Sequence, residues 1–230
     1  MVKVKLTKEP GAGKYIITAF PTVGYVSLLV TKYLEEKKFI KDIGYIDLEP
    51  TMPVAVISTG SLKFPIRVFE GSSFIIVTSE VPIQQSEVDK LVDMIISLYK
   101  KYKAKGIITI DGIMAEKGKE ASDVYYVSTA GHEIESAKRL NDGAMFGLNA
   151  GVALKAVSQD IDALILMSET HYEIPDGLAA ASLLNALAGV IGIKVDTKEL
   201  VTEYKKTLSK INELLKKVSQ NGEKKSEIYG

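Results

Sequence analysis

The sequence predicts a single α/β domain in which a mostly parallel β-sheet is flanked by helices. Its 230 residues are 46% hydrophobic and 25% charged, an ordinary globular composition. Short apolar runs rich in β-branched residues alternate with longer segments of helical periodicity, which favours parallel strands covered on both faces. No internal repeat or interdomain linker interrupts this alternation. We expect an α/β domain over 1–195, a long C-terminal helix over 196–219 and a flexible tail over 220–230.

The expected strands are apolar runs bounded by glycine, proline or polar residues. The run at 15–20 is closed by Pro21. The runs at 67–70 and 73–78 are joined by Glu70-Gly71-Ser72, a sequence typical of a hairpin turn. The remaining strands are expected at 43–48, 54–57, 106–110, 124–127 and 163–167.

The expected helices carry apolar residues at intervals of three and four. The clearest covers 84–102, and lysines crowd its last turn, where they suit the helix dipole. Two more are expected at 23–36 and 175–190. The C-terminal helix begins at Asp196-Thr-Lys-Glu199, which resembles a capping box.

The C-terminal helix has the apolar seam of a short coiled coil. The intervals between its apolar residues alternate between three and four. These residues are Val201, Tyr204, Leu208, Ile211, Leu215 and Val218. The seam could pack on the body of its own chain or on a neighbouring subunit, and the sequence favours neither.

Charge and residue usage argue against several classes of protein. Lys plus Arg is 29 and Asp plus Glu is 29, so the net charge is +0, which argues against a protein whose main role is to bind nucleic acid. The absence of cysteine excludes disulfides, thiolate zinc sites and iron–sulfur clusters. With only 2 histidines, an all-histidine metal cage is excluded as well, and we expect no metal.

No export or membrane signal is visible. The N-terminus alternates apolar and basic residues, so it lacks the apolar core of a signal peptide. The most apolar helical stretch, 178–193, falls short of the roughly 20 residues that span a bilayer. We expect a cytoplasmic protein with no membrane partner.

Acidic residues follow several of the expected strands. Asp111 follows the run at 106–110, and Glu169 and His171 follow the run at 163–167. In open α/β sheets ligands bind beyond the carboxyl ends of the strands, where a Glu and a His could share acid–base work. These three residues are candidates for a cleft. The alternative is that polar residues collect at strand ends because loops are solvated.

No recognised cofactor or nucleophile motif is complete. Gly147-Leu-Asn149-Ala-Gly151 has the frame of a nucleophile elbow, but Asn149 stands where the serine would be. Gly11-Ala-Gly13-Lys14 lacks the glycine spacing of a phosphate loop. We therefore expect no cofactor, and we interpret the glycines near Asn149 as sites of close packing.

The chain ends in Ile228-Tyr229-Gly230. This ending resembles the hydrophobic-tyrosine-any tail of proteins that dock on the proteasome core particle. A terminal carboxylate can pair with a lysine, and the tyrosine supplies a rigid apolar body with one polar tip. The alternative is a chance ending.

Residues from about 15 to 195 resemble the proteasome-assembly-chaperone family. The segments that carry the resemblance are Phe20–Val26, Phe74–Pro82, Gly106–Gly112, Gly147–Gly151, and Ala163–His171 with Pro175-Asp176. The resemblance implies a fold like that of the purine nucleoside phosphorylases, used as a scaffold without known catalysis. It also implies an archaeal-type homo-oligomer, and it carries over no catalytic residue.

On this basis we predict a non-enzymatic proteasome-binding protein, either an assembly chaperone or an activator. Ile228, Tyr229 and Gly230 would dock into pockets between subunits of the α ring of the core particle. The alternative function is a phosphorylase-like or ATP-grasp-like enzyme that uses the acids at the carboxyl ends of the strands.

Overall fold

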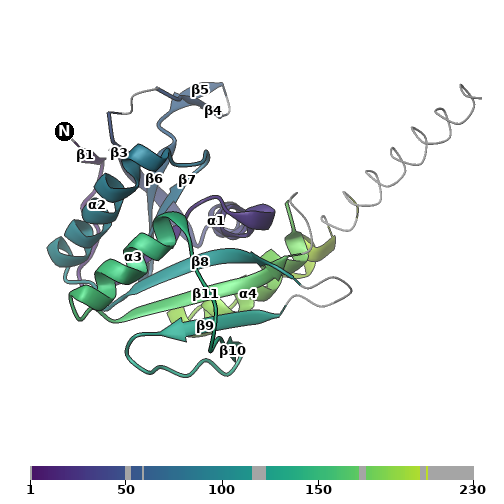
Figure 1. Cartoon of the computed structure of the whole chain (residues 1–230). Helices are drawn as coiled ribbons and strands as arrows, with labels where there is room; N and C mark the ends of the chain where they lie inside the picture. Colours follow the sequence, from purple (N-terminus) through teal and green to yellow (C-terminus); the bar gives the residue numbers. More distant parts are fainter. Residues whose placement is uncertain are drawn as a thin grey trace, which may run out of the picture.

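The computed structural model describes residues 2–49, 53–58, 60–115, 123–170, 175–202 and 206. Within these residues the chain forms a nine-stranded sheet, a separate two-stranded sheet and helices on both faces of the larger sheet (Figure 1). The strands of the large sheet are β1 (Lys3–Leu6), β2 (Tyr15–Ala19), β3 (Ile40–Asp47), β6 (Ile66–Gly71), β7 (Phe74–Ser79), β8 (Ile107–Met114), β9 (Val124–Ser128), β10 (Lys138–Arg139) and β11 (Ala163–Thr170). The small sheet pairs β4 (Val56–Ser58) with β5 (Ser61–Lys63).

The α-helices are α1 (Val26–Glu36), α2 (Val88–Lys101), α3 (Gly147–Ser158) and α4 (Gly177–Ile191). Short 3-10 turns precede two of them, η1 (Val23–Tyr25) before α1 and η2 (Gln85–Glu87) before α2. Asp176 caps α4, because its Oδ1 accepts hydrogen bonds of 3.0 Å from the amides of Leu178 and Ala179.

The large sheet has a parallel centre and mostly antiparallel flanks. Its order is β1-β3-β6-β7-β2-β8-β11-β9-β10, and β7, β2, β8 and β11 run parallel to one another. The predicted hairpin forms between β6 and β7. On the flanks, β1, β3 and β6 pair antiparallel, as does β9 with β11. The predicted α/β architecture is thus confirmed, with its parallel pairing concentrated in the middle.

Each face of the sheet carries its own hydrophobic core. Alternate residues of β2 face opposite sides: Ile16 packs in the core under α2 and α3, whereas Ile17 packs in the core under α1 and α4. Burial on both faces accounts for the continuous apolar runs of the central strands.

Several elements differ from the sequence-based expectations. Strands expected to end at 110 and 167 continue to Met114 and Thr170, because β8 and β11 stay paired to that point. The run at 54–57 contributes to β4, outside the large sheet. Helix α3 was not predicted; it packs closely on α2, since a Cβ at Gly151 would lie 3.0 Å from Cγ2 of Val92.

The described start of the C-terminal helix lies against the body. Oδ1 of Asp196 accepts from the amide of Lys198 at 3.1 Å, and Tyr33 of α1 donates to the carbonyl of Asp196 at 2.7 Å. Glu199 pairs with Lys37 instead of reaching back as in a capping box. The rest of the predicted seam falls outside the described residues, apart from Val201. None of the described helices is both long enough and apolar enough to cross a bilayer.

Candidate functional site

The predicted docking residues Ile228, Tyr229 and Gly230 lie outside the described residues, and so does His171. Of the predicted site residues, the described part of the chain contains Asp111 and Glu169. Both stand within strands rather than beyond them, because β8 and β11 continue to Met114 and Thr170.

Asp111 is a buried carboxylate with only 9% of its surface exposed. Its Oδ2 accepts from Nδ2 of Asn149 at 3.1 Å, and its Oδ1 accepts from the amide of Gly112 at 2.7 Å. Burial raises the pKa of Asp111 above its ordinary value, although hydrogen bonds from Thr22, Asn149 and Gly112 oppose the rise.

Asn149 stands where a nucleophile elbow would have its serine. Its side chain makes hydrogen bonds that join helix α3 to strands β2 and β8. It lies buried in α3, where its Oδ1 accepts from Oγ1 of Thr18 in β2 at 2.9 Å. Its Nδ2 also donates to the carbonyl of Ile110 in β8 at 3.3 Å. Because both atoms of the amide are engaged, we assign Asn149 a structural role in joining α3 to the sheet.

Glu169 lies on the same face of the sheet as Asp111. In the parallel pairing of β11 with β8, Asp111 is opposite Met167, and Glu169 is two residues further along its strand. Glu169 is buried and accepts from the hydroxyl of Tyr125 in β9 at 3.2 Å. The structure therefore places these two cleft candidates on neighbouring strands and buries both of them within the packed sheet.

The loop between β2 and α1 packs onto the carboxyl ends of the central strands. A Cβ at Gly112 would lie 2.1 Å from the carbonyl oxygen of Val23, and a Cβ at Gly24 would lie 2.3 Å from Oγ1 of Thr170. Gly24 also has a φ of 68°, in the left-handed region that glycine favours. Ligands of open α/β sheets bind at this edge, and here backbone of this loop covers the described ends of β8 and β11.

In the segment Gly11-Ala-Gly13-Lys14, which lacks the glycine spacing of a phosphate loop, the charge of Lys14 is balanced by Glu70. Nζ of Lys14 contacts Oε1 of Glu70 at 2.8 Å and the carbonyl of Gly71 at 2.6 Å. Glu70 also accepts from the amide of Gly11 at 3.1 Å and pairs with Lys8 at 2.9 Å. Lys14 therefore holds the chain to β6 instead of presenting a charge to a ligand.

Arg67 is likewise engaged within the protein. Its side chain is only 8% exposed, and it contacts Asp42, Glu35 at 3.4 Å and Glu80 at 3.5 Å. Its guanidinium also lies 4.5 Å from the ring centre of Phe69. With three carboxylates around it, Arg67 is unsuited to bind a phosphate.

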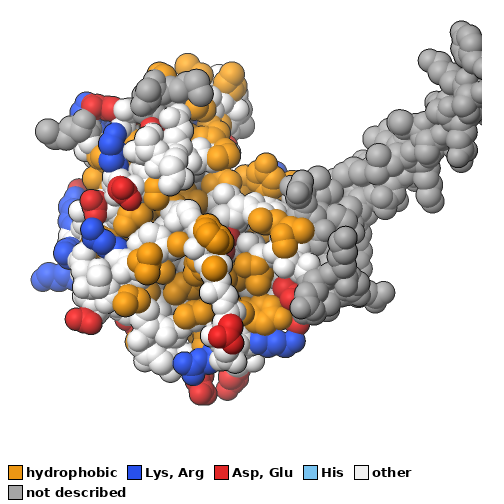
Figure 2. All heavy atoms as spheres, in the orientation of Figure 1, with side chains coloured by type: hydrophobic (Ala, Val, Ile, Leu, Met, Phe, Trp, Pro, Cys, Tyr) orange, Lys and Arg blue, Asp and Glu red, His pale blue; other side chains and the backbone are white. Residues whose placement is uncertain are grey.

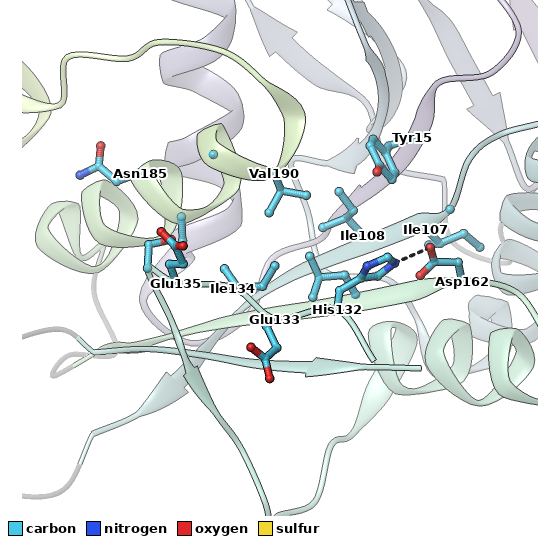
Figure 3. Close-up of a pocket in the computed structure, with 15 residues that line it drawn as sticks. Tyr15, Ile107, Ile108, His132, Glu133, Ile134, Glu135, Asp162, Asn185 and Val190 are labelled. Atoms are coloured by element: carbon cyan, nitrogen blue, oxygen red, sulfur yellow. Dashed lines mark hydrogen bonds and ion pairs between the residues drawn. The ribbon is translucent and has the colours of Figure 1, made fainter. Parts of the chain in front are cut away.

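A cavity of about 490 Å³ lies at the opposite edge of the sheet (Figure 3). It opens at the amino ends of β2, β8 and β11, marked by Tyr15, Ile107 and Leu164. The loop that contains His132 forms one side, and α4 forms the other with Asn185 and Val190. This volume falls within the roughly 300–1,000 Å³ of small-molecule pockets.

The cavity has an acidic lining. Nε2 of His132 contacts Oδ2 of Asp162 at 2.7 Å, and Glu133 and Glu135 lie on the same loop. No lysine or arginine is among its described lining residues, so its charge does not suit a phosphate-bearing substrate. Sequence reasoning missed this cavity, because His132 and Asp162 meet only through the packing of a loop against a strand start.

Comparison with known proteins places the chain among relatives of similar length. Residues 16–215 match the PAC2 family. An uncharacterized protein of Methanocaldococcus jannaschii is 25% identical over 203 residues, which cover 86% of this chain and 84% of that protein.

Two solved structures from Pyrococcus furiosus are similar over nearly their whole length. PbaA, an archaeal homolog of proteasome-assembly chaperone, superposes with a TM-score of 0.86 at 22% identity, covering 98% of this chain and 97% of PbaA. PbaB, an archaeal proteasome activator, has a TM-score of 0.79 at 18% identity, covering 95% of this chain and 98% of PbaB. These similarities establish a shared fold.

Proposed function

This chain belongs to the PAC2 family, and from that premise we propose that it is a non-enzymatic proteasome-binding protein, an assembly chaperone or an activator. Its C-terminal tail would dock into pockets between subunits of the α ring of the core particle. The observation that carries the proposal is the ending Ile228-Tyr229-Gly230 on a chain whose residues 16–215 match PAC2. The likeness to PbaA and PbaB supports the same role.

The body of the protein has the character of a scaffold. Asp111 and Asn149 are buried and hydrogen-bonded to each other. The positive charges of Lys14 and Arg67 are both paired with carboxylates of the protein itself. The loop at Val23 and Gly24 packs on the described ends of β8 and β11, at the edge where an enzyme of this architecture would bind its substrate. These contacts favour binding through the tail over the alternative, an enzyme acting through the acids of the strands.

A homo-oligomer would strengthen docking by presenting several tails at once. The outer side of α3 and the residue before it carry three exposed apolar side chains: Phe146 at 86%, Leu154 at 71% and Val157 at 59% exposure. Hydrophobic side chains gather over this helix and the strands beside it in Figure 2. Linked tails act at a high effective concentration, so weak contacts of single tails sum to useful avidity.

The proposal is tested by measuring the affinity of three proteins for archaeal proteasome core particles at fixed salt. The full-length chain should bind, and the chain lacking 228–230 should lose binding while keeping its melting temperature. Glu169→Gln, which changes a buried acid far from the tail in sequence, should bind like the full-length chain. Equal affinities for the full-length and truncated chains would refute tail docking.

The two roles within the proposal have different readouts. An activator should raise hydrolysis of a fluorogenic peptide by preassembled core particles. A chaperone should instead speed the formation of core particles from separate α and β subunits. If the chain changes neither rate although it binds, neither role is correct.

A further inference from the structure

A second, smaller pocket lies beside the β4–β5 hairpin and contains a buried acid. Its volume is about 140 Å³, well below the roughly 300 Å³ at which small-molecule pockets begin, so it suits one side chain. We call it the Glu87 pocket. Its lining residues are Ile46, Asp47, Leu48, Pro53, Val54, Phe64, Pro65, Ile66, Ser79, Val81, Pro82, Ile83, Gln84 and Glu87.

Glu87 is only 6% exposed, and its Oε1 has no hydrogen-bond partner in the described part of the chain. It ends η2 and stands at the N-cap of α2, yet its side chain makes no capping bond to that helix. Burying a carboxylate is costly unless donors or a positive charge balance it, so a cation bound beside Glu87 is favoured.

Among the described lining residues, the few side chains that can donate to this carboxylate are those of Ser79 and Gln84. Prolines 53, 65 and 82 have no backbone N–H, and most other lining side chains are aliphatic or aromatic. The charged lining residues are Asp47 and Glu87, both acidic, with no lysine or arginine among those described. A ligand that matches this pocket has a positive charge for the acids and an apolar chain for the walls.

Lysine fits this description better than arginine. An ammonium is a compact charge that can donate to a single oxygen, whereas a guanidinium is best satisfied by both oxygens of a carboxylate. The methylene stem of lysine would lie along the apolar walls.

The rim of the pocket indicates a protein partner. Val54 and Phe64 line the pocket and are 42% and 40% exposed, and Ile57 and Leu62 of the adjoining hairpin are 77% and 76% exposed. Hydrophobic side chains gather in this region in Figure 2, where the hairpin projects from the top of the molecule in Figure 1. A buried polar anchor surrounded by apolar contacts that exclude water is the usual anatomy of an interface hot spot.

From these observations we propose that the Glu87 pocket receives a lysine side chain of a partner protein, flanked in the partner by apolar residues that pack on the β4–β5 hairpin. This contact is separate from the C-terminal tail, and its test needs no proteasome. Failure of one proposal therefore leaves the other standing.

The first experiment titrates the full-length protein by NMR at low salt with Nα-acetyl-lysine N-methylamide and with the norleucine analogue, which lacks the amine. Amide signals of Val81, Ile83 and Glu87 should shift, with about tenfold higher affinity for the lysine probe. Glu87→Gln should abolish this preference, whereas Asp89→Asn, an exposed acid two residues away, should preserve it. Equal affinities for the two probes, or an unchanged preference in Glu87→Gln, would overturn the proposal.

A variant at the rim provides an independent check. Val54→Trp replaces a partly exposed residue and should close the mouth of the pocket, so it should abolish lysine binding without altering Glu87. If Glu87→Gln does not fold, this variant decides: lysine binding that persists in Val54→Trp refutes the pocket.

The nature of the partner is tested with peptides. Acetyl-Leu-Lys-Leu-amide should bind more tightly than acetyl-Gly-Lys-Gly-amide, and Leu62→Ser should reduce the difference. Equal affinities for the two peptides would exclude the hairpin from the interface. An affinity for spermidine equal to or above that of the leucine-flanked peptide would assign a polyamine ligand and overturn the choice of a protein partner.

Discussion

A Cβ atom at Gly112 would lie 2.1 Å from the carbonyl oxygen of Val23. The loop after β2 therefore rests directly on the backbone of β8, and the amide of Gly112 also donates to Oγ1 of Thr22 at 3.2 Å. Parallel α/β sheets commonly open a crevice at this edge. In the described part of this protein, the loop at Val23 covers that edge where β8 reaches Gly112.

Replacement of Gly112 by alanine should therefore destabilise the protein strongly. The new methyl group would meet backbone rather than a flexible side chain, so we expect a loss of about 2–4 kcal/mol in the free energy of unfolding. The matched control is Gly189→Ala in α4, where a Cβ would meet nothing within 4 Å. That change should stabilise the protein by about 0.5–1 kcal/mol. Urea denaturation of both variants checks the contrast, and similar effects for the two would contradict the packing described here.

Glu70 should stabilise the N-terminal segment in a pH-dependent way. Burial alone would raise its pKa, but Lys14, Lys8 and the amide of Gly11 lower the pKa of Glu70 from 4.5 to about 2. A carboxyl group whose pKa is lowered on folding contributes stability above its unfolded pKa and loses it as the pH falls. At pH 7, Glu70→Gln should cost about 2 kcal/mol, allowing for solvent screening, and the cost should shrink between pH 4.5 and pH 2.

The control for Glu70 is a surface ion pair of the same charge type. Glu36 lies 3.7 Å from Lys32 on α1, and both side chains are mostly exposed. Glu36→Gln should change stability by less than about 0.5 kcal/mol. Chemical denaturation at pH 2.5, 4.5 and 7 measures both variants. A cost for Glu70→Gln that does not vary with pH would show that the charge of Glu70 is not what stabilises the segment.

Asp111 should have the opposite pH dependence. Burial raises its pKa above the ordinary value of 3.8, so the folded state keeps the proton at pH values where the unfolded state has lost it. The wild type therefore loses stability relative to Asp111→Asn as the pH rises from about 3.8 through the folded pKa. The difference in unfolding free energy, variant minus wild type, should become more positive between pH 4 and pH 7. A difference that is constant or falls over this range would contradict the assignment.

The sequence predicted the layers of the fold better than the ends of its elements. The periodicity of 84–102 identified α2, because its buried residues Leu91, Ile95 and Leu98 are aliphatic and regularly spaced. Helix α3 was not predicted, because its buried apolar residues are interspersed with glycines and with exposed apolar residues. The buried ones are Leu148, Val152 and Ala156, and the exposed ones are Leu154 and Val157. Apolar residues on both sides of a short helix obscure its periodicity.

The candidate site could be predicted only in part, for a related reason. The sequence identified Asp111 and Glu169 as cleft candidates after two expected strands, and the structure shows that these strands, β8 and β11, are paired. It could not reveal that both acids are buried, because strand length depends on pairing between segments far apart in the chain. The pair of His132 with Asp162 and the burial of Glu87 likewise arise from tertiary contacts that leave no local pattern.

The exposed apolar side chains of α3 should support self-association. Leu154→Asp would place a charge on this surface without disturbing the core, since Leu154 is 71% exposed. We expect light scattering at micromolar concentration to give an oligomer for the wild type and a smaller species for Leu154→Asp. The control Leu62→Asp, at a similarly exposed position on the β4–β5 hairpin, should keep the wild-type mass. A strictly monomeric wild type would remove the avidity argument.

We propose that Tyr229 is the anchor of the docking tail. Tyr229→Ala should weaken binding to core particles nearly as much as deletion of 228–230, because it removes the largest contact surface and the one side-chain hydroxyl of the ending. A buried aromatic anchor is commonly worth about 2 kcal/mol or more, which is about a thirtyfold loss for each tail. Tyr229→Phe should cost less, since it keeps the ring.

An added residue after Gly230 should also weaken binding, because it moves the terminal carboxylate away from a basic partner. All these variants are titrated against core particles at one salt concentration, and their melting temperatures should match that of the wild type. The losses should multiply where several tails engage together. If wild type, Tyr229→Ala and the extended chain bind with equal affinity, Ile228-Tyr229-Gly230 is a chance ending and the docking proposal fails.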